Sequence, residues 1–289
     1  MSTVCILGAG ELGGAVAHAL ARGGRVDRVH VFDEAAAVAA GKALDIQQAG
    51  AVEHSATRLD ASGDPQRAAG ADVYVVADRA GRPPVEWAGD DGVALLSRLV
   101  PLAGRAPVVF AGVLQGPLML AAAGDLGVGR QRLIGSAPEA VRAAARSLVA
   151  LEARCSPTEV DLAVLGVPGS FVLPWGEASI GGHRLERTLG QVQLRRLEAQ
   201  LDGLWPPGPF ALGLAAARTA EAILLTSRRR FDVTAVLDGE WGVRGGTGIV
   251  PALLSGAGIA DTRLPELDTR ERVRLDSVLA SQAGPTSLL

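Results

Sequence analysis

The stretch "ILGAGELGGAV", residues 6–16, places Gly8, Gly10 and Gly13 in G-x-G-x-x-G spacing. The apolar run that ends in these glycines predicts a strand, and "ELGGAVAHALARGG" (11–24) has the apolar spacing of a helix that stops at glycine. Glycines at such a turn let the backbone approach a pyrophosphate, whose charge is stabilised by the N-terminus of the following helix. The stretch therefore predicts a strand–turn–helix unit that binds a dinucleotide.

Asp33 ends the next predicted strand, "RVHVFDE" (28–34), at about the separation expected for a carboxylate that binds an adenosine ribose. A carboxylate there repels a 2′-phosphate, which favours NAD over NADP. The carboxylate of Glu11 suits the helix dipole but crowds a pyrophosphate if it points inward. Alternatively, the glycines serve only strand–helix packing in a sheet that has lost its ligand. The residues expected to line the dinucleotide site are Gly8, Gly10, Glu11, Leu12, Gly13, Asp33, Ala77 and Gly112.

Strands and helices alternate through the first half of the chain. The alanine-rich stretch 35–50 predicts a helix, and residues 71–78 and 106–112 are continuous apolar runs typical of strands buried on both faces of a parallel sheet. "RLIGSA" (132–137) is a shorter run of the same kind. Strands separated by helices indicate right-handed βαβ units, so the predicted fold class is α/β, with a doubly wound parallel sheet.

After about residue 138 the pattern changes to a mixture of helices and antiparallel strands. We expect helices at 138–153, 190–203, 210–228 and 268–282, a strand at 160–166, and paired strands in 231–242 and 248–259. The sequence thus predicts two domains, a Rossmann dinucleotide-binding domain at 1–137 and an α+β domain at 138–289.

The composition limits the partners and the location that we expect. Of 289 residues, 48% are apolar and 20% charged, and a net charge of −3 gives no electrostatic reason to expect nucleic acid or a membrane as a partner. Cys5 and Cys155 lie far apart without CxxC spacing, so no disulfide framework and no metal site is predicted. No apolar run approaches the roughly 18 residues of a membrane span and no signal pattern opens the chain, so we expect a cytoplasmic protein.

Five further segments follow one another along the chain: "VHVFDEAAAVAAGKALDIQQA" (29–49), "GADVYVVADRAG" (70–81), "RLIGSAPEAVRAAAR" (132–146), "FVLPWGEASIGG" (171–182) and "LDGEWGVRGGTGIVPALLSGAGI" (237–259). In this order they resemble the lactate/malate dehydrogenase family, including its G-x-A-x-D-L-x-x-A and V-P-x-W-S-x-A-x-x-G-G patterns. The resemblance implies NAD as the cofactor and a homodimer or homotetramer. It also implies reduction of 2-oxo acids by NADH, in which a histidine donates the proton, an aspartate orients the histidine, and arginines bind the substrate carboxylate.

Carried over residue by residue, this catalytic pattern fails in the present sequence. The family's catalytic histidine, its aspartate, its substrate arginine and its asparagine–proline pair fall, in that order, on Pro168, Val141, Ala144, Gly112 and Val113. Proline cannot carry a proton and alanine cannot bind a carboxylate. The resemblance therefore predicts the family's fold without its standard chemistry.

Few other residues qualify as replacements. Arg82, in the loop "AGRPPVEWAGDD" (80–91), is a candidate for a substrate-facing cation, and a solvated loop arginine is the alternative. The hydroxyl of Ser170 is a candidate for a hydrogen bond to a ligand, and a turn serine that bonds its own backbone is the alternative. Glu86 and Glu177 lie nearer to the expected substrate than most carboxylates.

The remaining aromatic, amide and imidazole side chains are expected to have structural roles. Trp87 is expected to pack or to cover the site, and Gln115 is expected near the position of the family's Asn-Pro-x-Asp aspartate. None of the histidines is predicted to be catalytic; they are His18, His30, His54 and His183. A cleft that is hydrophobic and uncharged is expected between Pro168, Phe171, Pro209 and Phe210.

Four functional hypotheses remain open at this point. The first is a pseudoenzyme that binds NAD(H) and acts through partners. The second is an NAD-dependent oxidoreductase that takes a small neutral carbonyl or imine, because a pocket without arginine rejects dicarboxylates. The third is a genuine lactate or malate dehydrogenase, and the fourth is an assembly subunit with both sites empty.

Overall fold

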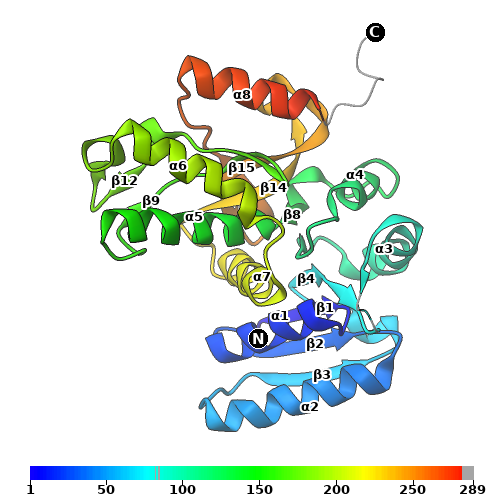
Figure 1. Cartoon of the computed structure of the whole chain (residues 1–289). Coiled ribbons are helices and arrows are strands. Elements are labelled where there is room, and N and C mark those ends of the chain that lie inside the picture. The colour runs from blue at the N-terminus through cyan, green and yellow to red at the C-terminus, as the bar shows by residue number, and fades with distance from the viewer. Residues whose placement is uncertain (82, 84, 282–289) are drawn as a thin grey trace.

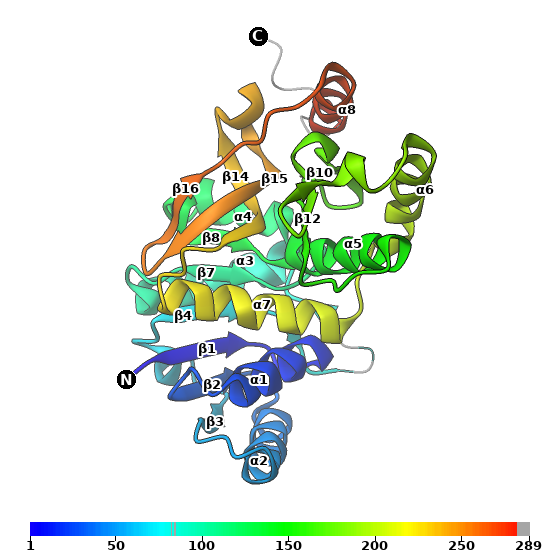
Figure 2. The same cartoon turned by 90° about the vertical axis from the view of Figure 1, so that its left-hand side faces the viewer.

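Six parallel strands stand side by side in the order β3-β2-β1-β4-β7-β8 in the computed structural model, which describes residues 1–81, 83 and 85–281 (Figures 1 and 2). The strands are β1 (Thr3–Leu7), β2 (Arg28–Phe32), β3 (Arg58–Ser62), β4 (Val73–Val76), β7 (Val108–Phe110) and β8 (Leu133–Gly135). The order reverses between β1 and β4, where the crevice of a doubly wound sheet opens. The predicted α/β fold class is confirmed.

Alternate residues of these strands face two separate helical layers. Val4 and Ile6 of β1 belong to a core with α1 (Glu11–Gly23), α2 (Ala36–Val52) and α7 (Pro209–Leu224). Cys5 and Leu7 belong to the core on the other face, with α3 (Gly89–Ala103) and α4 (Gly116–Gly124). Because both faces are covered, the strands are continuous apolar runs, as the sequence predicted.

The helix α7 lies between α1 and α5 (Ala137–Ala153) in both views of the chain (Figures 1 and 2). It approaches α1 closely at Gly213, where a Cβ would lie 2.6 Å from the Cβ of Ala15. Gly213 therefore allows two helices from distant parts of the sequence to pack backbone to backbone.

The second half of the chain extends the same sheet with antiparallel strands, in the order β8-β14-β15-β10-β11. The added strands are β10 (Leu165–Val167), β11 (Ser170–Val172), β14 (Arg230–Asp238), β15 (Arg244–Ser255) and β16 (Gly258–Thr262), which pairs with β15. Helices α6 (Gln191–Leu201) and α8 (Thr269–Ala280) complete this half. The predicted helices and the pairing of the two late strands are thus present.

One predicted strand is wrong. The stretch 160–166 forms two strands that belong to different sheets, β9 (Val160–Asp161) and β10. β9 pairs with β12 (Ser179–Ile180), which pairs with β13 (His183–Arg184) in a small outer sheet. Residues 162–164, which join β9 to β10, and Leu165, which begins β10, are all buried and apolar. The run therefore looks like one continuous strand in the sequence.

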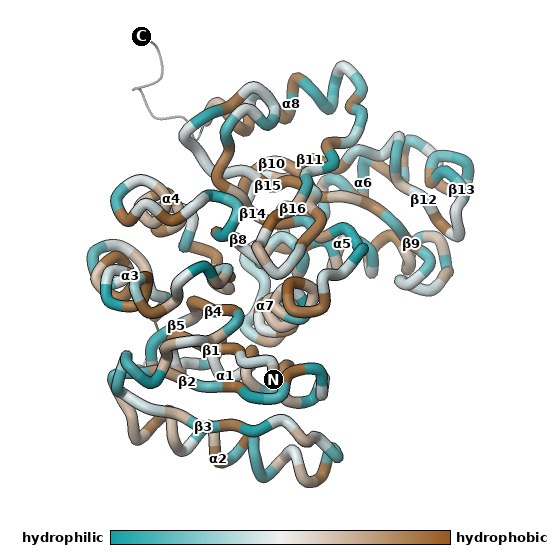
Figure 3. Tube along the Cα trace, turned by 180° about the vertical axis from the view of Figure 1, so that it is seen from behind, coloured by the Kyte–Doolittle hydropathy of each residue, from teal (hydrophilic) through white to brown (hydrophobic). Residues whose placement is uncertain are grey.

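Hydropathy follows these layers, with most central strands apolar and the β12–β13 end of the molecule hydrophilic (Figure 3). Over the described residues, none of the helices combines the length and the apolar character that a membrane span requires.

Candidate functional site

The loop between β1 and α1 places the three glycines of the fingerprint at the carboxyl end of the central strand. Gly8 has φ +120°, a conformation that L side chains rarely adopt, and its N–H donates to the carbonyl oxygen of Phe32 at 2.7 Å. A Cβ on Gly13 would lie 2.0 Å from the carbonyl oxygen of Gly8. The first turn of α1 can therefore approach the loop only with glycine at position 13.

Asp78, the first residue of the short strand β5 (Asp78–Arg79), fills the space in front of this loop. Its Oδ1 accepts the N–H of Gly13 at 2.8 Å, and its Oδ2 accepts the N–H of Leu12 at 3.1 Å. Its backbone carbonyl accepts the N–H of Gly10 at 2.9 Å. A Cβ on Gly10 would lie 2.3 Å from the carboxyl carbon of Asp78, so glycine at position 10 makes room for a carboxylate of the chain itself.

Asp33 directly follows β2 and is engaged in the same way. Its Oδ2 accepts the N–H groups of Ala9 at 2.7 Å and Ala80 at 2.8 Å, and its Oδ1 accepts the N–H of Ala35 at 2.8 Å. Only 2% of the residue is exposed. The carboxylate predicted to bind a ribose thus ties together the loops that follow β1, β2 and β4.

Glu86 of β6 (Val85–Glu86) occupies the loop after β7. Its two carboxylate oxygens accept the N–H groups of Val113 and Leu114, each at 2.9 Å. A Cβ on Gly112 would lie 2.2 Å from Oε2 of Glu86. The glycine expected to contact the cofactor therefore lies against a carboxylate of the chain.

Gln115 has a structural position in the same loop. Its Oε1 accepts the N–H of Gly112 at 2.9 Å, and its Nε2 donates to the carbonyl oxygens of Ala77 at 3.1 Å and Trp87 at 3.3 Å. With 1% of its surface exposed, it bridges the carboxyl ends of β4 and β7. The side-chain amide of Gln115 is not free to bind a substrate, because its oxygen and its nitrogen both already bond backbone groups.

These contacts decide whether a dinucleotide fits the site as the structure shows it. A bound diphosphate takes the N–H groups of the glycine loop and of the first turn of α1. Those of Leu12 and Gly13 already donate to Asp78, and a second anion in the same place meets a like charge. In this arrangement the residues do not fit a diphosphate.

Most of the predicted cofactor residues are close together, around Asp78. Glu11 is exposed and points elsewhere, into a cavity of about 560 Å³ that it shares with His18, Lys42 and Phe210. Asp78 itself was missed by the sequence reasoning. The available signal was a carboxylate placed directly after the apolar run of β4, where the central crevice of the sheet opens.

The electrostatic state of Asp78 reflects two opposing influences. Burial raises the pKa of Asp78, and the N–H groups of Gly13 and Leu12 together with the charge of Lys42 offset only part of that increase. The ammonium of Lys42 donates to the carbonyl oxygen of Gly10, on the adjoining part of the loop. The carboxylate is therefore supported by a helix N-terminus and a lysine, yet largely removed from water.

The turn that corresponds to the family's proton-donor position is apolar. Pro168 and Gly169, the latter with φ +86°, join β10 to β11, and the ring of Phe171 lies 5.7 Å from that of Trp205 in an edge-on arrangement. Ser170, the first residue of β11, is exposed. The turn holds no group that donates a proton at neutral pH.

The residues predicted to line one apolar cleft are divided between two places. Phe171 is buried with Trp205 in the core of the second half, whereas Phe210 is 84% exposed and, with Pro209, lines the cavity beside α1 and α2. The prediction that Pro209 and Phe210 face Pro168 is wrong, because α7 packs its first turns against α1.

The positions of the family's other catalytic residues hold small or apolar side chains on α5. Val141 is fully buried and Ala144 is partly buried. Arg142 bonds the carbonyl oxygen of Leu162 at 2.7 Å and the carboxylate of Asp161 at 3.0 Å, and Arg146 bonds the carbonyl oxygen of Pro157 at 2.7 Å. The two nearby arginines are therefore engaged by the chain itself.

Several other predicted residues also have structural roles. Trp87 is buried, with the guanidinium of Arg79 5.5 Å above its ring, and Glu177 accepts the backbone N–H of Glu266 at 2.7 Å. Arg82 lies outside the described residues. Of the histidines, His30 is buried beside Asp60, and the others are at least partly exposed; these are His18, His54 and His183.

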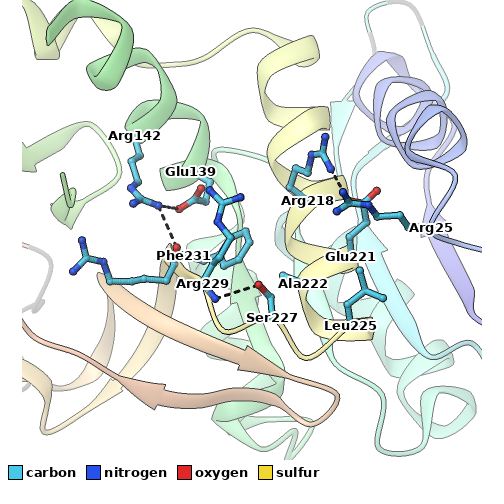
Figure 4. Close-up of a pocket in the computed structure, with 11 residues that line it drawn as sticks. Arg25, Glu139, Arg142, Arg218, Glu221, Ala222, Leu225, Ser227, Arg229 and Phe231 are labelled. Carbon is cyan, nitrogen blue, oxygen red and sulfur yellow. Dashed lines mark hydrogen bonds and ion pairs between the residues drawn. The ribbon is translucent and has the colours of Figure 1, made fainter. Parts of the chain in front are cut away.

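A second cavity, of about 450 Å³, opens between α1, α5, α7 and the start of β14 (Figure 4). The buried carboxylate of Glu221 pairs there with Arg218 at 2.9 Å and Arg25 at 3.5 Å, and Glu139 accepts a bond from Arg142. Arg229 and Arg230 also line the cavity, so its two carboxylates offset only part of the positive charge of its five arginines.

Comparison with known proteins gives a consistent picture. Residues 2–86 match the family described as lactate/malate dehydrogenase, NAD binding domain. The malate dehydrogenase of Desulforudis audaxviator is 28% identical over 299 residues, covering 97% of this chain and 96% of that protein. The structure of the malate dehydrogenase from Aeropyrum pernix matches with a TM-score of 0.86 and 21% identity, covering 96% of each chain. That of the Cryptosporidium parvum lactate dehydrogenase, complexed with lactic acid and nicotinamide adenine dinucleotide, matches with a TM-score of 0.84 and 21% identity, over 97% and 95% of the two chains.

Proposed function

The chain belongs to the lactate/malate dehydrogenase family, and we propose that it is a member that has lost the reduction of 2-oxo acids. The cofactor of the matched domain is NAD, as the sequence predicted. The chain is thus an NAD-binding dehydrogenase fold, and the proposal concerns the chemistry that it performs.

The observation that carries the proposal is the apolar turn at Pro168. Reduction of a 2-oxo acid leaves an alkoxide that needs a proton, and an anionic substrate needs a cation that binds its carboxylate. Proline stands at the proton-donor position, and alanine, at Ala144, stands at the arginine position. Arg142 and Arg146 do not supply the missing cation, because both bond backbone oxygens.

A genuine malate dehydrogenase is the second candidate. It is supported by the similarity to the Desulforudis audaxviator protein, which is named a malate dehydrogenase and matches over 97% of this chain. An oxidoreductase for a neutral carbonyl or imine is supported by the same apolar turn that disfavours 2-oxo acids.

The test is NADH oxidation with oxaloacetate, with pyruvate and with a panel of aldehydes, ketones and imines. With the first two substrates we expect turnover at least about a thousandfold below the roughly 10 s⁻¹ of a median enzyme. The Desulforudis audaxviator protein, run in parallel, serves as the positive control for the assay. Turnover of oxaloacetate at an ordinary enzymatic rate would establish the second candidate instead.

We also propose that the chain self-associates. The surface of α2 and α7 carries exposed apolar side chains, namely Val38, Leu44, Phe210 and Leu214. Sedimentation velocity is expected to show a dimer or tetramer, and Phe210→Glu is expected to shift it toward the monomer. A monomer at every concentration would contradict this proposal.

A further inference from the structure

The anion position at the N-terminus of α1 already holds an anion that belongs to the chain. The carboxylate of Asp78 receives the N–H groups of Leu12 and Gly13, which are the groups that a diphosphate receives in a dinucleotide-binding fold. We propose that Asp78 is a built-in competitor for the diphosphate of NAD, so that the cofactor binds only when this carboxylate leaves the loop. The inference rests on the proposed function, since it concerns the cofactor site of the same dehydrogenase fold.

The competition is steric as well as electrostatic. The carboxyl group of Asp78 fills the room that glycine leaves at position 10, since a Cβ there would lie 2.3 Å from its carboxyl carbon. The backbone of Asp78 fills the room at Gly8, where a Cβ would lie 2.2 Å from its carbonyl oxygen. Gly10, the glycine that the fingerprint assigns to close approach of a ligand, is therefore used for close approach of residue 78, and so is Gly8 at the tight turn.

The charges around the loop favour one anion and not two. Asp78 accepts the N–H of Gly13 at the N-terminus of α1, and the ammonium of Lys42, which bonds the carbonyl oxygen of Gly10, is near enough to favour its charged form. Asp33 adds a further negative charge at the same loop, where it accepts the N–H of Ala9. A diphosphate that entered beside an ionised Asp78 would meet repulsion in a largely buried space, so the carboxylate must be displaced first.

Asp78 is one of three carboxylates that accept backbone N–H groups in the loops at this edge of the sheet. Asp33 receives the amides of Ala9 and Ala80, and Glu86 receives those of Val113 and Leu114. The loops at the carboxyl ends of β1, β4 and β7 are thus closed by side chains of the chain. Among the three, Asp78 alone bonds the first-turn amides of a helix, and it is therefore the one that a diphosphate must replace.

Two substitutions of Asp78 distinguish the steric effect of its side chain on NADH binding from the effect of its negative charge. Asp78→Ala empties the position and leaves the two amides free. Asp78→Asn keeps an oxygen of similar reach but removes the charge. Asp125→Ala, at an exposed site at the end of α4, changes the net charge equally and serves as the matched control.

The measurement is the dissociation constant of NADH, from fluorescence and calorimetry on the full chain, with circular dichroism and thermal unfolding to establish that each variant is folded. The binding-competent state is the one in which residue 78 has left the loop, and the apparent affinity for NADH falls in proportion to the population of that state. Asp78→Ala is therefore expected to bind NADH at least about tenfold more tightly than the wild type. Asp78→Asn is expected to lie between the two, and Asp125→Ala to equal the wild type. If Asp78→Ala does not fold, the comparison of Asp78→Asn with the wild type decides the proposal alone.

Equal affinity in the wild type, Asp78→Asn and Asp78→Ala would overturn the inference, and so would the absence of NADH binding in all three. These results are distinct from failure of the proposed function, which is measured as turnover of oxaloacetate or pyruvate. Assays of Asp78→Ala with both substrates keep the two separate, because a tightly bound cofactor without turnover supports both proposals.

Discussion

The Oδ1 atom of Asp78 lies 2.8 Å from the backbone nitrogen of Gly13, although the two residues are 65 positions apart in the sequence. The same contact explains why the fingerprint glycines are present in a loop that, in this structure, holds no room for a diphosphate. The turn needs glycine whether the group that approaches it is a phosphate or a carboxylate. The G-x-G-x-x-G pattern therefore predicts the conformation of the loop, but it does not predict whether a phosphate or a carboxylate binds there.

The stability of the fold is expected to depend on pH through Asp78. Burial raises the pKa of Asp78 above the ordinary value of 3.8, so the folded state holds the proton more tightly than the unfolded state. The stabilisation from protonated Asp78 is complete below that ordinary value and is lost as the pH rises through the raised pKa. We therefore expect the free energy of unfolding of Asp78→Asn, relative to the wild type, to increase from pH 3.5 to about pH 7. Urea unfolding at several pH values measures it, with Asp125→Asn as a flat control. A decrease over the same interval would mean that the helix N-terminus outweighs burial.

Replacement of glycine by alanine is expected to have opposite effects on stability at two positions. One position lies in the close contact between α1 and α7, and the other is exposed on α2. Gly213→Ala places a Cβ 2.6 Å from the Cβ of Ala15 and 2.9 Å from its carbonyl carbon, so we expect a loss of roughly 1–3 kcal/mol from overpacking. Gly41→Ala, on the exposed side of α2, meets nothing within 4 Å and is expected to gain about 0.5–1 kcal/mol. Chemical denaturation measures both, and a stabilised Gly213→Ala would show that the two helices move apart at little cost.

The cavity between α5 and α7 contains a carboxylate whose charge is used for stability. Glu221 is 3% exposed and pairs with Arg218 and Arg25, whose side chains are about half exposed (Figure 4). Solvent weakens such pairs, so Glu221→Gln is expected to lower the free energy of unfolding by about 1 kcal/mol. The exposed Glu159→Gln is the control and is expected to change it by less than about 0.5 kcal/mol. The expectation fails if high salt leaves the difference between Glu221→Gln and the wild type unchanged, because screening should reduce it.

The fold was largely predictable from the sequence, because its strands are apolar runs between helices with a clear glycine turn. The absence of the family's catalytic side chains at positions 168, 141 and 144 was also readable, since each is a property of one position. The occupants of the loops were not, because Asp78 and Glu86 reach amides that are distant in sequence. The division of the run 160–166 between two sheets was missed because the apolar residues 162–165, which join the two strands, are buried and make the run resemble one strand.

The last prediction concerns the turn at Pro168. Pro168→His supplies an imidazole on the loop between β10 and β11, yet we expect no turnover of oxaloacetate or pyruvate above the wild-type background. A general acid contributes a factor of about 10²–10⁴ only when the substrate is held within hydrogen-bond reach of it. Ala144 supplies no cation for the substrate carboxylate, and Val141 supplies no carboxylate to orient the ring. The assay is NADH oxidation in the Asp78→Ala background, with thermal unfolding to establish that the variant folds. Clear turnover by Pro168→His in that background, above the turnover of Asp78→Ala alone, would reveal a cation near the turn and would make the genuine dehydrogenase the better account of this site.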